Sequence, residues 1–127
     1  MRALQIVSLL ALAACGGGSA PCPTSAGTSC GSCDITIAGQ CVDFAGLSGA
    51  DLSTVQALCK RDQGLFGATL CQSPDRIGSC QLPPTTPGTG VTTSSATVEL
   101  RYYAPRYSLA TATKACAGAP GTTFTAN

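Results

Sequence analysis

The sequence predicts a small disulfide-rich α+β domain in which a short antiparallel sheet carries two helices. The chain has 127 residues, with nine cysteines and neither tryptophan nor histidine. Its large apolar residues are few and scattered, so the hydrophobic core alone would supply little net stability. Disulfides typically add about 2–4 kcal/mol each, and they are the expected source of the remainder. Segments with strand-like alternation and with helical periodicity set the expected elements.

Residues 30–82 are expected to form a Cys-rich first unit. Apolar and polar residues alternate over 35–44, which predicts a strand. Ser48 followed by Asp51 is typical of a helix start, because serine caps free backbone N–H groups and an acidic residue favours the positive helix N-terminus. The apolar face of this helix comprises Leu52, Val55, Leu58 and Cys59. Two further strands are expected, over 66–71 and 80–82.

Residues 96–127 are expected to form a second unit, joined to the first by a Pro/Thr/Gly-rich loop or linker over 83–95. Residues 97–103 alternate between apolar and polar, which is typical of a half-buried antiparallel strand. A short helix over 108–117 and a strand over 122–125 complete this unit.

The two units resemble an imperfect strand-helix-strand repeat. Residues 52–59 and 109–116 share the pattern L-x-T-x-x-x-x-C, and a glycine follows each helix cysteine at the same distance. Self-similarity of this kind indicates repeated supersecondary units. We therefore expect Cys59 and Cys116 each to tie a helix to the sheet.

The first fourteen residues have the features of a signal peptide. Arg2 provides a positive start, and residues 3–14 form an apolar stretch of the right length for export but too short to span a bilayer. Ala11-Leu12-Ala13 fits the site of an ordinary signal peptidase. Leu12-Ala13-Ala14-Cys15 instead resembles the lipobox of bacterial lipoproteins.

The lipobox resemblance implies cleavage between Ala14 and Cys15 and a diacylglyceryl group on the Cys15 thiol. Two or three acyl chains would anchor the protein to a membrane without a transmembrane helix. Residues 15–29 would then be a lipidated flexible tether. Gly16 after the lipid site implies the outer membrane rather than the inner one within the cell envelope. The mature part also resembles small Cys-rich lipoproteins of delta-proteobacteria, a likeness that implies no activity.

Cysteine parity agrees with lipidation. If Cys15 is a thioether, an even number of cysteines remains, and an exported protein can pair them all. The candidates for disulfide pairing are Cys22, Cys30, Cys33, Cys41, Cys59, Cys71, Cys80 and Cys116. Their connectivity stays open at this point.

Cys30-Gly31-Ser32-Cys33 is a CxxC motif, for which three interpretations compete. It can belong to structural disulfides, act as a thiol-disulfide couple, or supply half of a zinc site completed by Cys22 or Cys41. A redox CxxC normally opens a helix after a strand, whereas here a strand is expected to follow. We expect structural disulfides, and thiol-disulfide or metal handling through Cys30 and Cys33 is the alternative.

Composition disfavours several function classes. Without histidine the chain lacks Ser-His-Asp and Cys-His catalysis, and loss of Arg2 leaves equal numbers of basic and acidic residues, so no nucleic-acid partner is expected. The carboxylates are expected on the surface, with Asp51 at a helix start. A Tyr/Arg cluster is a candidate contact patch for a protein or glycan and comprises Arg101, Tyr102, Tyr103, Arg106 and Tyr107. The sequence thus predicts a membrane-anchored structural or binding module with no catalytic activity, metal or cofactor.

Overall fold

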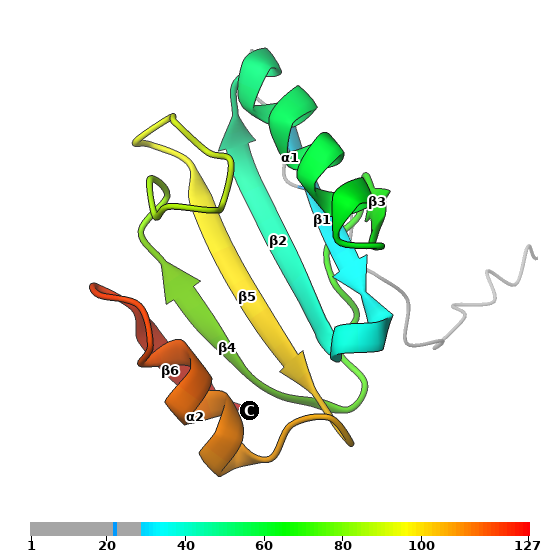
Figure 1. Ribbon diagram of the computed structural model, residues 1–127, viewed down its shortest axis with the longest axis vertical. Coiled ribbons are helices and arrows are strands. Elements are labelled where there is room, and N and C mark those ends of the chain that lie inside the picture. Colours follow the sequence, from blue (N-terminus) through cyan, green and yellow to red (C-terminus); the bar gives the residue numbers. More distant parts are fainter. Residues whose placement is uncertain (1–21, 23–28) are drawn as a thin grey trace, which may run out of the picture.

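The structure is a computed structural model that describes Cys22 and residues 29–127. One antiparallel sheet of six strands carries two α-helices on the same face (Figure 1). The strands are β1 (Ser29–Ile35), β2 (Gln40–Leu47), β3 (Leu65–Gly67), β4 (Arg76–Leu82), β5 (Thr97–Tyr103) and β6 (Thr123–Ala126). The helices are α1 (Gly49–Arg61) and α2 (Leu109–Cys116), with a 3-10 turn, η1, at Thr36–Ala38. The predicted α+β class and the two helices are confirmed, but the sheet is larger than the short one expected.

The two halves of the sheet have the same strand order when each is followed from its outer edge to the centre. The order across the whole sheet is β3-β1-β2-β5-β4-β6, so each half is a hairpin whose first strand also pairs with the strand that follows the helix. Each unit is therefore strand, strand, helix, strand. The expected unit has one strand fewer, because the sequence pattern predicts a single strand over 35–44, whereas η1 and Gly39 (φ +65°) turn the chain there. β4, expected in the first unit, pairs with β5 and β6.

Equivalent positions in the two halves have the same residues. Gly31-Ser32-Cys33 of β1 corresponds to Gly78-Ser79-Cys80 of β4. In each half an aromatic ring covers the glycine: a Cβ at Gly31 would lie 2.6 Å from Phe66, and one at Gly78 would lie 2.5 Å from Phe124. The close approach of ring and backbone therefore requires glycine at both places.

A serine caps each helix. The Ser48 side chain accepts the N–H of Asp51 at 3.1 Å at the start of α1, as predicted. The Ser108 hydroxyl oxygen accepts the N–H of Thr111 at 3.2 Å, and the Thr111 hydroxyl oxygen accepts the N–H of Ser108. These two bonds form a capping box at the start of α2. Both helices are thus positioned by the same type of cap.

The CxxC motif lies inside β1 rather than before a strand. Glycine is depleted in strands, and residues 29–33 show no apolar–polar alternation, so the sequence pattern does not predict that β1 begins at Ser29. Pairing with β2 on one side and β3 on the other gives these residues extended backbone. Tertiary pairing here overrides local preference.

Candidate functional site

The eight described cysteines form four disulfides. The bridges are Cys22–Cys30, Cys33–Cys59, Cys41–Cys71 and Cys80–Cys116. The predicted disulfide framework is therefore confirmed, including the ties from Cys59 and Cys116 to the sheet. Cys30 and Cys33 pair with different partners, so the CxxC does not form a bridge of its own. In the part of the chain that the structure describes, no group of three His, Cys, Asp or Glu side chains converges as a metal site.

The proposed lipidation site falls outside the described residues, as do Ala14 and the whole expected signal peptide. The sequence has nine cysteines, and eight of them are paired with one another. No cysteine of the chain therefore remains as a partner for Cys15.

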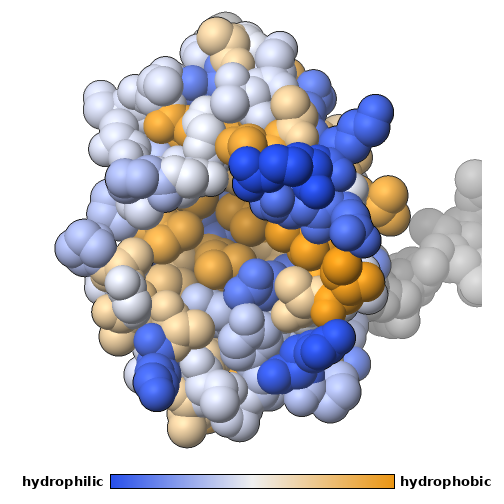
Figure 2. Space-filling model, viewed as in Figure 1, coloured by the Kyte–Doolittle hydropathy of each residue, from blue (hydrophilic) through white to orange (hydrophobic). Residues whose placement is uncertain are grey.

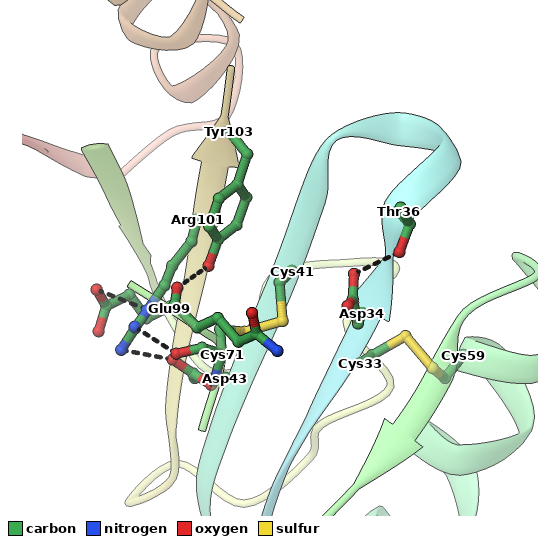
Figure 3. The surroundings of a disulfide bond; sticks show 11 residues. Cys33, Asp34, Thr36, Cys41, Asp43, Cys59, Cys71, Glu99, Arg101 and Tyr103 are labelled. Carbon is green, nitrogen blue, oxygen red and sulfur yellow. Dashed lines mark hydrogen bonds and ion pairs between the residues drawn. A yellow bond between two sulfur atoms is a disulfide. The ribbon is translucent and has the colours of Figure 1, made fainter. Parts of the chain in front are cut away.

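The sheet face opposite the helices carries a buried ion pair. Arg101 Nη2 lies 2.7 Å from Asp43 Oδ2, and Arg101 Nη1 donates to the Cys71 carbonyl at 3.0 Å (Figure 3). The Cys71 N–H donates to Asp43 Oδ1 at 2.7 Å. Burial raises the pKa of Asp43, while the Cys71 N–H and the Arg101 charge oppose that rise. These contacts and the Cys41–Cys71 bridge hold the segment after β3 against the sheet, so their role is structural.

A second buried carboxylate fastens the loop over 83–95 to α1. Asp51 Oδ1 accepts the Thr92 N–H at 3.1 Å and the Thr92 hydroxyl at 2.7 Å, and Oδ2 accepts the Thr93 N–H at 3.0 Å. These bonds to the charged form lower the pKa of Asp51 to about 2. The expectation that the carboxylates lie on the surface is thus wrong for Asp43, which is 6% exposed. Asp51 lies at a helix start as predicted, and it is buried there, with 2% exposure. The loop is an ordered part of the domain.

A hydrophobic hollow opens on the helix-bearing face (Figure 2). It lies between α1 and the loop after β4, with β1, β2, β5 and the end of β4 as its floor, and it has a volume of about 330 Å³. Its apolar side chains are Ile35, Val42, Phe44, Val55, Leu58, Leu82, Pro87 and Val98, together with the Cys33–Cys59 disulfide. This hollow is the main candidate binding site.

The structure divides the predicted Tyr/Arg patch between the two faces of the sheet. Tyr102 is 1% exposed and packs on Tyr107 with ring centroids 4.7 Å apart, beneath α2. Arg101 lies on the opposite face in the ion pair with Asp43. Tyr103 and Arg106 line a smaller depression of about 290 Å³ at one end of the sheet, where the Tyr103 hydroxyl donates to the Gln72 carbonyl. The five side chains therefore do not form one contact patch.

Sequence reasoning missed the hollow because its lining comes from five separate segments. Only the long loop over 83–95 could have indicated it, since loops of this length in compact domains often carry function. No protein-family model matches the chain, and no curated protein or solved structure shows significant similarity to it. Within the described residues, neither α1 nor α2 is long and apolar enough to cross a membrane.

Proposed function

We propose that the protein is a lipid-anchored component of the cell envelope whose disulfide-linked domain is a binding module without a reaction of its own. The observation that carries the anchoring is the pairing of every other cysteine, which leaves Cys15 alone at the end of Leu12-Ala13-Ala14-Cys15. A thiol in that position is the acceptor of a diacylglyceryl group in bacterial lipoproteins. Two acyl chains or more give stable membrane attachment, whereas one is marginal.

The domain is well suited to a position at the end of a short lipidated segment. The Cys22–Cys30 bridge joins the end of that segment to β1, so the chain enters the domain at a covalently fixed point. Four disulfides suit an oxidising compartment such as the periplasm. Gly16 after the lipid site favours the outer membrane.

Binding is proposed instead of catalysis because the chain has no histidine and because its two buried carboxylates are engaged within the protein. Asp43 is engaged by Arg101 and the Cys71 N–H, and Asp51 by Thr92 and Thr93. A catalytic carboxylate must reach a substrate, and neither of these does. The hollow beside α1, in contrast, is open and unfilled by side chains.

Intact mass of the full-length gene product, expressed in a bacterium and extracted from membranes, tests the anchoring. We expect a chain that begins at Cys15, carries at least two acyl chains and lacks two hydrogens for each of four bridges. Cys15→Ser should lose both the lipid mass and membrane partitioning, whereas Ser19→Ala in the same segment should behave like the parent. Normal cleavage and unchanged membrane partitioning of Cys15→Ser would refute the proposal.

A further inference from the structure

We propose that the hollow between α1 and the loop over 83–90 binds the single aliphatic chain of a membrane-derived amphiphile, such as a fatty acid. This inference deepens the binding role proposed above and names its ligand class. The hollow has about 330 Å³, near the lower end of the range of ligand pockets. That size suits one chain and a small headgroup better than a folded peptide segment.

The lining is aliphatic and accessible. Val42 and Leu82 on the floor and Leu58 on α1 are only half-buried, although they are among the larger apolar side chains of the domain. Phe44, Val55 and Val98 lie deeper and are at most 5% exposed. Covering such half-buried apolar surface with hydrocarbon is favourable at roughly 25 cal/mol per Å².

The polar groups around the hollow are already bonded within the protein. The Thr86 hydroxyl donates to the Pro83 carbonyl at 2.6 Å, and the Thr89 hydroxyl donates to the Thr86 carbonyl at 2.8 Å. The Asp62 carboxylate, which borders the hollow, is held by Arg61 at 2.8 Å. A polar ligand would thus find no free hydroxyl donor there, whereas a hydrocarbon chain needs none.

In the described residues of the other half, side chains occupy the corresponding space between helix and sheet. There the region between α2 and the sheet is filled by Tyr102, Tyr107 and Phe124, whose rings pack together. The same strand and helix arrangement can therefore be packed with side chains between helix and sheet. The hollow results from the particular side chains of the first half and from the position of the loop after β4. Asp51 fastens the loop to α1, and Gly90 lets the loop approach that helix closely, since a Cβ there would lie 2.6 Å from Leu58.

The test uses the full chain with Cys15→Ser, exported into an oxidising compartment, with dodecanoate as the probe and calorimetry as the readout. We expect saturable one-to-one binding. Val42→Phe should place a ring in the hollow and weaken binding by about tenfold or more, since overpacking excludes even small groups. Ile77→Phe, which makes a similar change in the second half, should leave the affinity within about twofold. If Val42→Phe does not fold, Leu58→Trp replaces it.

The lipidated wild-type protein distinguishes the two sources of an acyl chain. Comparable binding of dodecanoate by the lipidated and Cys15→Ser proteins supports an external ligand. Binding by Cys15→Ser alone would mean that the protein's own acyl chain fills the hollow, which overturns the proposal of an external ligand. Absence of saturable binding by a Cys15→Ser protein with no free thiols, or equal weakening by Ile77→Phe, would also overturn it. Failure of the anchoring would show separately in the intact mass.

Discussion

The two halves of the sheet share one topology but differ in what lies between helix and sheet. Both have the sequence Gly-Ser-Cys on the first strand, a disulfide from that cysteine to the helix, and an aromatic ring over the glycine. In the second half, a helix of eight residues closes over packed tyrosines. In the first, a helix of 13 residues borders a hollow. The glycine, the disulfide and the aromatic ring are common to both halves and hold each helix on the sheet, whereas the side chains between helix and sheet differ and leave a hollow beside α1.

The hairpin connections show the same contrast. β1 and β2 are joined by a tight turn that ends at Gly39, whereas the loop between β4 and β5 extends over 83–96. That longer loop belongs to the second half by topology, yet it packs on α1 of the first half through Val91 and Asp51. Each half therefore contributes one wall of the hollow.

Removing the helix disulfides tests how far the halves are equivalent, and we expect the largest effects here. Chain entropy predicts losses of about 3.5 kcal/mol without Cys33–Cys59 and about 3.8 kcal/mol without Cys80–Cys116, from separations of 26 and 36 residues. Urea unfolding of the double alanine variants would measure both.

Amide exchange in the same variants should separate the two helices. Without its bridge, α2 keeps only Ala112 as a buried anchor, so its amides should exchange rapidly. α1 should stay protected, since Val55 is buried and Asp51 bonds the loop. Equal loss of protection in α1 and α2 would show that the extra contacts of the first half do not stabilise its helix.

The glycines beneath the aromatic rings provide a smaller, matched test. Gly31→Ala and Gly78→Ala should each destabilise the protein by about 2 kcal/mol. The new methyl group would overlap the ring of Phe66 or Phe124 and the backbone carbonyl of the residue that follows that phenylalanine. Gly49→Ala, with open space around its Cβ, should change the stability little. Thermal or urea unfolding gives all three values. A difference of more than about 1 kcal/mol between the first two would argue against equivalent environments.

Local patterns predicted the parts of the fold that depend on neighbouring residues. The helix start at Ser48, the helix over 109–116 and the strand over 97–103 were all anticipated from caps and periodicity. The pattern shared by the two helix segments also indicated that each helix cysteine joins the sheet, as Cys59 and Cys116 do.

Features that depend on distant partners could not be predicted in this way. β1 is made of small residues and forms because β2 and β3 flank it. The sequence predicts Asp43 as a surface carboxylate and Asp51 only as a helix-start residue, because their partners lie 28 or more residues away, at Cys71, Thr92 and Arg101. The hollow has the same origin, because its walls come from separate segments brought together only by folding.

Asp51→Asn tests how the loop wall of the hollow is fastened. The pKa of Asp51 is about 2 in the folded protein and near 3.8 without its partners. A lowered pKa means that the carboxylate contributes its full stability above pH 3.8 and loses it as the pH falls through about 2. The wild-type protein should therefore lose stability over this interval.

Asp51→Asn should have lower stability at neutral pH and a flatter profile at acid pH, because the titrating group is gone. Amides of Thr92 and Thr93 should exchange faster, whereas those of β4 and β5 should not. The matched control is Asp62→Asn, whose carboxylate is exposed and bonded only to Arg61, a type of pair that contributes little. If Asp51→Asn retained the acid profile of the wild type, the charge of Asp51 would not be what holds the loop, and the packing of Val91 in the core would be the remaining attachment to test.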